Sequence, residues 1–175
     1  MLVLSAILVA FSVSLVASVS ATEYSVGSGS EDWWTVYPDQ HDDAGSEVDH
    51  PQWILDLLAD RPVLILDHST NCEPCLDQES YVEAVMEDYG DEVAYENLIT
   101  GIGNSRADML FDIYDPNGVK ATMPLTVLLT LVEDDGEVVV GWHSMEDTAG
   151  GEELVRALVE DAIDYYDENV DDWEA

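Results

Sequence analysis

Apolar positions along the chain form two kinds of pattern, short unbroken runs and longer helical stripes. Residues 63–66 are an unbroken run (Val-Leu-Ile-Leu), which predicts a central strand covered on both faces. Residues 81–89 place apolar side chains at helical spacing, and Gly90 follows as a stop signal. The pattern therefore predicts a buried strand that leads through a short connection into a helix.

The rest of the pattern extends this unit in both directions. Pro51 opens a predicted helix with apolar residues on one face, and Arg61-Pro62 ends it. Asp134-Asp135-Gly136-Glu137 supplies the turn of a predicted hairpin. The other predicted elements are a strand at 93–99, a helix at 107–114, hairpin strands at 125–132 and 138–142, and an amphipathic helix at 154–166. The order βαβαββα after the opening helix indicates an α/β fold.

The N-terminal part differs in composition from this unit. Residues 1–21 are uncharged and mostly apolar, which favours a signal peptide cleaved before Thr22 or, alternatively, a membrane anchor. Residues 22–47 are predicted to be an acidic, Ser- and Gly-rich linker, flexible near residues 25–30. Within it, the aromatic stretch from Trp33 to Tyr37 is predicted to dock as an edge strand. The folded domain is expected at 48–168, followed by an acidic tail at 169–175.

The net charge of the chain indicates the ionic strength at which the protein works. The chain has 39 acidic residues against 4 Lys and Arg, a formal net charge of −35, and the acids are dispersed between apolar positions. Such a shell repels itself at low ionic strength and is screened in molar salt, so the charge indicates adaptation to a very salty medium. The alternative is a polyanionic surface for a basic partner. A basic footprint for nucleic acid is excluded.

The candidate chemistry lies directly after the predicted buried strand, at Cys72-Glu73-Pro74-Cys75. A helix N-terminus lowers a cysteine's pKa, and the thiolate is the nucleophile in disulfide exchange. Cys72 is therefore predicted to attack, and Cys75, one turn inside the helix, to resolve the mixed disulfide. Pro74 is tolerated because an N–H in the first turn of a helix has no hydrogen-bond acceptor within the helix, so its absence costs nothing there. Glu73 should raise the thiol pKa, an effect that salt would weaken.

Other interpretations of the two cysteines are a static disulfide and a metal site. A short loop constrains the unfolded chain little, and the chain has no further cysteine for a disulfide framework. Zinc normally takes four ligands, so His68 and His143 would have to complete such a site. We expect neither a resident metal nor a cofactor.

The buried strand, the Cys72-Glu73-Pro74-Cys75 helix start and Met123-Pro124 before a later strand together resemble the thioredoxin-like superfamily. The resemblance covers about residues 50–166. It implies a thioredoxin-like fold, with a central mixed β-sheet flanked by helices, and a cis-proline at Pro124 that faces the disulfide. It also implies that Met123, Pro124, Glu73 and Pro74 contact the substrate. The opening helix resembles the exported thiol-reductase branch.

Two positions depart from the superfamily's pattern. Asn71 stands where a tryptophan usually precedes the first cysteine, and Leu66 stands where a buried acid usually takes up a proton. Asp67 is the candidate proton relay, provided that the strand bulges, because it should otherwise lie on the opposite face. Water or Glu73 could take that role instead.

The sequence thus predicts a monomeric, extracytoplasmic thiol-disulfide oxidoreductase of an extreme halophile. It would be exported, either extracellular or attached to the outer face of the membrane. Its partners would be protein thiols and disulfides, with a membrane protein or a small thiol as electron donor. The Cys-x-Pro-Cys linker resembles reducing members and favours reductase. The alternatives are a copper or zinc chaperone that uses Cys72, Cys75 and His68, and a redox-inert interaction module.

Overall fold

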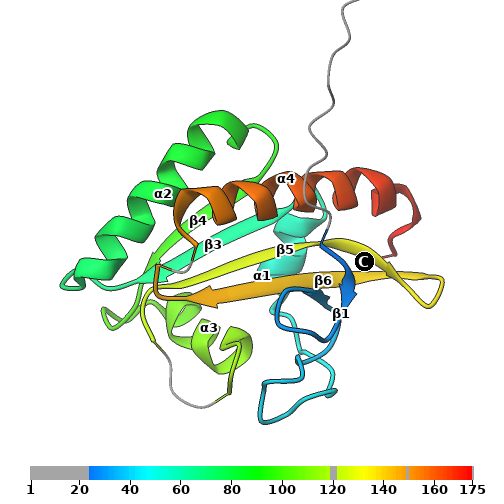
Figure 1. The fold of residues 1–175 in the computed structure, drawn as a ribbon, viewed down its shortest axis with the longest axis horizontal. Helices are drawn as coiled ribbons and strands as arrows, with labels where there is room; N and C mark the ends of the chain where they lie inside the picture. Colours follow the sequence, from blue (N-terminus) through cyan, green and yellow to red (C-terminus); the bar gives the residue numbers. More distant parts are fainter. Residues whose placement is uncertain (1–23, 119–121, 149, 175) are drawn as a thin grey trace, which may run out of the picture.

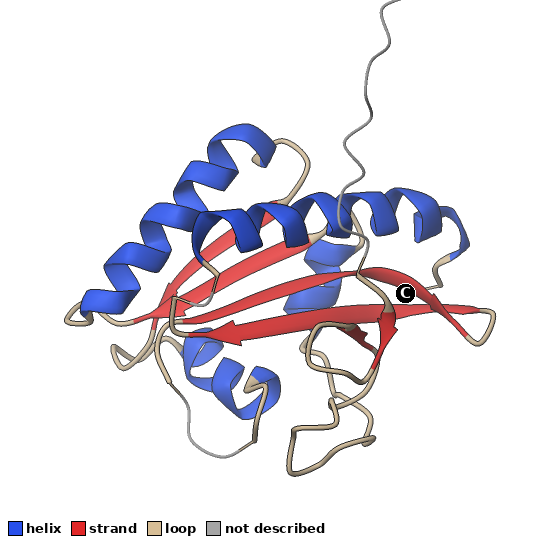
Figure 2. Cartoon of the chain, viewed as in Figure 1, coloured by secondary structure: helices blue, strands red, loops and turns tan. Residues whose placement is uncertain are grey.

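A computed structural model describes residues 24–118, 122–148 and 150–174 as a layered α/β fold (Figures 1 and 2). A six-stranded mixed sheet, in the order β1-β2-β6-β5-β3-β4, is covered by helices. The elements are β1 (Val26–Gly27), β2 (Trp33–Trp34), α1 (Gln52–Leu58), β3 (Val63–His68), α2 (Glu73–Tyr89), β4 (Ala94–Ile99), α3 (Ser105–Tyr114), β5 (Leu125–Asp134), β6 (Glu137–Glu146) and α4 (Gly151–Asn169). The predicted α/β fold is confirmed, with each predicted helix and strand of the main unit present.

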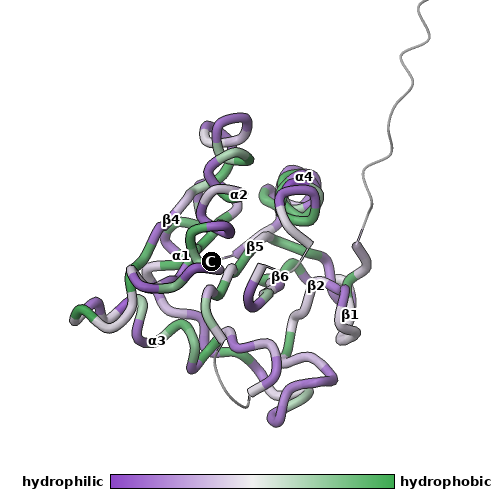
Figure 3. The backbone as a smooth tube through the Cα atoms, turned by 60° about the vertical axis from the view of Figure 1, so that its left-hand side comes forward, coloured by the Kyte–Doolittle hydropathy of each residue, from purple (hydrophilic) through white to green (hydrophobic). Residues whose placement is uncertain are grey.

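Strand β3 is central because both of its faces are covered. All six of its residues are buried, as the unbroken apolar run predicts. Val63 and Ile65 point into one core with α1 and α3, whereas Leu64 packs with α2 and α4 on the other face. Figure 1 shows these two helix pairs on opposite sides of the sheet. In Figure 3, hydrophobic and hydrophilic residues alternate around α2 and α4, as expected for helices that bury one side.

The predicted hairpin is confirmed. Strands β5 and β6 pair antiparallel from Leu125↔Glu146 to Asp134↔Glu137. Asp135 and Gly136 form the turn with φ of 49° and 86°, a left-handed pair that matches the twist of a two-residue hairpin.

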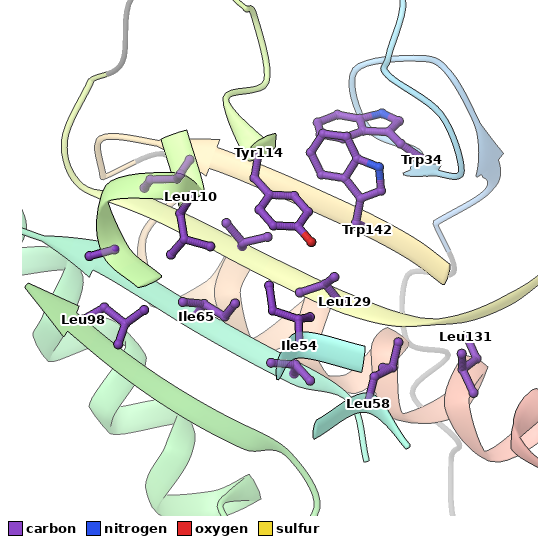
Figure 4. Close-up of a cluster of buried hydrophobic side chains, with 14 of the residues drawn as sticks. Trp34, Ile54, Leu58, Ile65, Leu98, Leu110, Tyr114, Leu129, Leu131 and Trp142 are labelled. Carbon is purple, nitrogen blue, oxygen red and sulfur yellow. The ribbon is translucent and has the colours of Figure 1, made fainter. Parts of the chain in front are cut away.

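The segment before α1 is folded against the sheet. Strand β2 pairs antiparallel with β6 through Trp34↔Trp142, and β1 pairs parallel with β2. Both tryptophans of β2 are buried, and the Trp34 ring packs edge-on against Trp142 at 4.9 Å between centroids (Figure 4). The prediction of a flexible spacer around residues 25–30 is therefore wrong, because β1 pairs with β2 in the sheet.

The chain also continues in ordered form after the predicted domain end. A 3₁₀ turn spans Val170–Asp172, and Val170 and Trp173 pack against the α1 and α3 core. The acidic tail expected at 169–175 is thus docked on the fold through these two apolar side chains.

The predicted signal peptide or anchor at 1–21 lies outside the described residues. In the part of the chain that the structure covers, none of the helices has the length and apolarity that crossing a bilayer requires.

Candidate active site

Cys72 and Cys75 lie where α2 begins, four residues after β3 ends, and they are joined by a disulfide with Cα atoms 5.2 Å apart. Cys72 is the N-cap residue in extended conformation, and its Sγ accepts the backbone N–H of Cys75 at 3.2 Å. Cys72 is half-buried, whereas Cys75 is fully buried. Only the first sulfur is therefore accessible to another protein.

The start of α2 favours a negative charge on the Cys72 sulfur. The sulfur accepts a backbone N–H of the first turn, and these N–H groups lie at the positive end of the helix dipole. Pro74 fits because it occupies the first turn, where its missing N–H breaks no helical bond. Glu73 and Pro74 are both exposed beside Cys72. The Cys72 sulfur thus combines a helix N-terminus with an open approach.

Pro124 reaches the same end of the sheet from β5. The Met123–Pro124 peptide bond is cis, and the Pro124 carbonyl accepts the Asp147 N–H at 2.9 Å. Because β5 runs antiparallel to β3 and Leu125 pairs with Asp67, Pro124 lies beside the end of β3, close to the cysteine loop. Pro124 is buried and Met123 is partly exposed.

Glu146 at the end of β6 anchors the segment before Pro124. Its carboxylate accepts the Thr122 backbone N–H and, at 3.2 Å, the Asn117 side-chain amide. Burial raises the pKa of the Glu146 carboxyl, and the Thr122 hydrogen bond opposes that shift. One carboxylate therefore accepts hydrogen bonds from both Asn117 and Thr122.

Asp67 lies on the face of β3 turned away from α2. The ladders of β3 with β4 and with β5 are continuous from Val63 to Asp67, so the strand has no bulge. The bulge that a relay at Asp67 would need is therefore absent. The Asp67 carboxyl is fully buried, and no side chain donates a hydrogen bond to it in the described structure. Burial, reinforced by Asp108 on α3, raises its pKa to about 7.

Gln78, which the sequence analysis did not identify, is a buried polar residue beside Cys75. It lies three residues along α2 from Cys75, on the same buried face, and both side chains are fully buried. Its Nε2 donates to the Thr126 hydroxyl at 3.0 Å. Thr126 is two residues after Pro124, so this hydrogen bond links the cysteine-bearing helix to the strand that follows the cis-proline. A glutamine among apolar helix positions is the signal that could have indicated it.

His68 has hydrogen-bonded neighbours that the sequence pattern did not indicate. Its Nε2 lies 2.7 Å from the Asn97 Oδ1, and the Asn97 Nδ2 donates to Glu79 on α2 at 2.8 Å. The imidazole is thus held between the end of β3 and α2. His143 is separate, with its Nδ1 3.0 Å from the Asp32 carbonyl oxygen.

Among the residues with described positions, no group of three or more His, Cys, Asp or Glu side chains is arranged to hold a metal ion. The two histidines proposed for a metal site have other partners, as given above. The structure therefore offers no observation that favours the metal-chaperone alternative.

Two large apolar side chains are exposed at this end of the molecule. Leu76, directly after Cys75, is 60% exposed, and Ile102 is 71% exposed between two glycines after β4. Strands β3 and β4 are parallel, so the loops that follow them lie at the same edge of the sheet. Exposed apolar side chains therefore lie at the same end of the sheet as the disulfide.

Neither a protein-family model nor a curated protein matches the chain. Solved structures that match include chloroplastic thioredoxin z, at 17% identity over 66% of this chain and 91% of that chain, with a TM-score of 0.45. Thioredoxin of Fasciola hepatica matches at 16% identity over 63% and 89%, with a TM-score of 0.43. A mutant thioredoxin from Halobacterium salinarum matches at 22% identity over 68% and 88%, also with a TM-score of 0.43.

The fold is defined by the chain's own topology. Parallel β3 and β4 are linked through α2, an antiparallel β5–β6 hairpin follows, and α4 covers the sheet. A Cys-x-x-Cys disulfide opens α2 and a cis-proline precedes β5. The chain thus has a thioredoxin-like α/β fold with a Cys-x-x-Cys disulfide at the start of α2.

Proposed function

We propose that this protein is an extracytoplasmic thiol-disulfide oxidoreductase that works mainly as a reductase of protein disulfides. The observation that carries the proposal is the asymmetry of the cysteine pair. Cys72 presents a half-buried sulfur at a helix N-terminus, and Cys75 holds a fully buried sulfur within bonding distance of it. An accessible nucleophile with a protected partner is the arrangement that two-step disulfide exchange requires.

The reaction runs through one mixed disulfide. The Cys72 thiolate attacks one sulfur of the substrate disulfide, that S–S bond breaks, and the leaving thiolate takes a proton from water. Cys75 then loses its proton and attacks the Cys72 sulfur, which breaks the mixed disulfide and releases the second substrate thiolate. The substrate gains two electrons and the Cys72–Cys75 pair loses two. An external dithiol protein or a small thiol must then reduce the pair.

Protein substrates would bind beside the cis-proline. Met123 and Pro124 directly precede β5 at the end of β3, the end of the sheet where the disulfide lies, and Glu73 and Pro74 lie between the two cysteines at the start of α2. Exposed Leu76 and Ile102 add apolar area on the open side. Such side chains are favourable for docking an extended chain and of little use for a small disulfide.

The substrate class is tested by Ile102→Ser. We expect its kcat/KM for a disulfide-containing protein to fall roughly tenfold, because a central apolar contact is lost. Turnover of a small disulfide should stay within about twofold, because the sulfur chemistry is untouched. Met109→Ser, at an exposed methionine of α3, is the matched control. Equal loss with both substrates would contradict docking at Ile102.

The proposed location is outside the cytoplasm, either extracellular or held at the outer face of the membrane. The uncharged apolar segment at 1–21 supports export, by a cleaved signal or as an anchor. A membrane protein is a suitable electron donor there, and the protein would act as a monomer.

We also propose that the protein works in concentrated salt. Arg61, Arg106 and Arg156 already pair with acids at the surface, so most acidic side chains have no cation to match them. We expect the urea midpoint of unfolding to rise steeply as KCl increases from about 0.1 M to 2 M, where screening is nearly complete. NaCl at equal ionic strength should act alike. A midpoint that is flat or falls with salt would contradict the proposal.

A further inference from the structure

The reaction above needs a group that takes the proton of buried Cys75, and the structure offers His68. The residue is 5% exposed, and its Nδ1 has no hydrogen-bond partner among the residues described. A buried ring nitrogen without a partner costs free energy unless it has another use. The unpartnered atom is therefore the first sign of a role beyond packing.

The partners of the other ring nitrogen determine the form of the imidazole. Asn97 presents its carbonyl oxygen to the His68 Nε2, because the Asn97 amide nitrogen donates to Glu79. A carbonyl oxygen only accepts, so Nε2 carries the hydrogen. In the neutral ring Nδ1 is then a free lone pair. A base oriented by a second residue, itself oriented by a third, is the arrangement found where histidine activates a nucleophile.

The imidazole lies against the part of α2 that carries Cys75. The His68 Nε2 is 3.8 Å from the Glu79 Oε1, and Glu79 is four residues after Cys75, on the same side of the helix. His68 is also on the same face of β3 as Leu66, since successive side chains alternate. It therefore occupies the layer between β3 and α2, next to Glu79, which is one helical turn after Cys75.

The neighbouring ionisable groups leave His68 as the base on this face. Glu79 on α2 accepts a hydrogen bond from the Asn97 side-chain amide and so orients the residue that contacts His68. Burial, reinforced by Glu79 and Glu83, raises the pKa of Tyr95 on β4, so this side chain remains neutral. Asp67 points to the α3 side, as the continuous strand ladder requires.

We propose that His68 takes the proton of Cys75 during resolution of the mixed disulfide, with Asn97 and Glu79 as positioning residues. The Cys75 S–H bond breaks and the proton moves to the His68 Nδ1. The Cys75 thiolate forms the bond to the Cys72 sulfur, and the substrate thiolate leaves. The imidazolium then returns its proton to water or to that thiolate. This inference rests on the proposed function.

The two steps can be observed separately with the reduced full chain in molar KCl and one equivalent of dithiobis(nitrobenzoate). Attack by Cys72 releases the first coloured thiolate, and resolution by Cys75 releases the second. In His68→Gln we expect the first phase within about twofold of wild type and the second roughly a hundredfold slower at pH 7. The pH profile of the second phase should lose one titration step and follow the thiol alone. Asn97→Leu, which keeps the base but not its orientation, should slow the second phase roughly tenfold.

His143→Gln removes another buried histidine, two strands from β3, and serves as the matched control for folding and for both phases. The inference is overturned if His68→Gln keeps the wild-type second phase across the pH range. It is equally overturned if Asp67→Asn, and not His68→Gln, removes the titration step. Absence of the first phase in the wild type would overturn the proposed function itself, and the inference with it.

Discussion

Replacing Cys72 by serine should lower the rate of protein-disulfide reduction by about three orders of magnitude or more. The hydroxyl of serine is a far weaker nucleophile than a thiolate at neutral pH, and the helix N-terminus that assists Cys72 cannot compensate for that difference. The fold should persist, because Cys72 is only half-buried and the substitution is nearly isosteric. The measurement is the rate of disulfide reduction with an excess of dithiol donor.

Cys75→Ser separates the two cysteine roles. This variant keeps the nucleophile and loses the resolving thiol, so a covalent adduct should accumulate through Cys72. Mass spectrometry under non-reducing conditions should find the substrate on the Cys72 peptide, and dithiothreitol should release it. The double variant Cys72→Ser, Cys75→Ser is the control that traps nothing. An adduct that forms equally well in Cys72→Ser would contradict the assigned roles.

Trp33→Ala should give the largest loss of stability among single substitutions in the N-terminal segment, about 3–5 kcal/mol. The Trp33 side chain is fully buried against α4, and its Nε1 donates to the buried carboxylate of Asp161 at 2.6 Å. Alanine would leave a cavity and remove a donor from that carboxylate. The measurement is urea unfolding in molar KCl, followed by circular dichroism.

Trp33→Phe isolates the hydrogen bond from the packing. It keeps most of the apolar volume and should cost about 1.5–3 kcal/mol, the range for a lost hydrogen bond to a charged group. Trp173→Ala, at a half-buried tryptophan near the C-terminus, is the control and should cost about 1 kcal/mol. If Trp33→Ala behaved like this control, the segment would not be part of the cooperative fold.

The sequence pattern predicted the main unit well because its elements are locally determined. The run at 63–66 and the Gly-containing turn at Asp135 each carry their signal within a few residues. The docking of residues 25–30 was missed because β1 is only two residues long. Its place depends on Asp161, which is distant in sequence: the carboxylate accepts the Tyr24 N–H as well as the Trp33 indole. No local pattern reports such a contact.

The residues of the candidate site also differ in whether their roles depend on local sequence or on distant residues. Cys72 and Cys75 follow from spacing, and Pro124 follows from a resemblance that spans the domain. Gln78 was not identified, and His68 was considered only as a metal ligand, because their roles depend on which strand and which helix face each other. His68 is defined by Asn97, 29 residues away, and Gln78 by Thr126, 48 residues away. The strand register that turns Asp67 away from α2 likewise becomes certain only when both ladders are seen to be continuous.

The central claim is that Cys72 and Cys75 exchange electrons reversibly. The most direct measurement equilibrates the protein in molar KCl with glutathione buffers of graded ratio, traps free thiols by alkylation and counts them by mass spectrometry. We expect one reversible two-electron transition in which both cysteines change together, with a midpoint inside the range of about −270 to −120 mV known for dithiol proteins. Cysteines that stay oxidised throughout, or that titrate independently of each other, would contradict it.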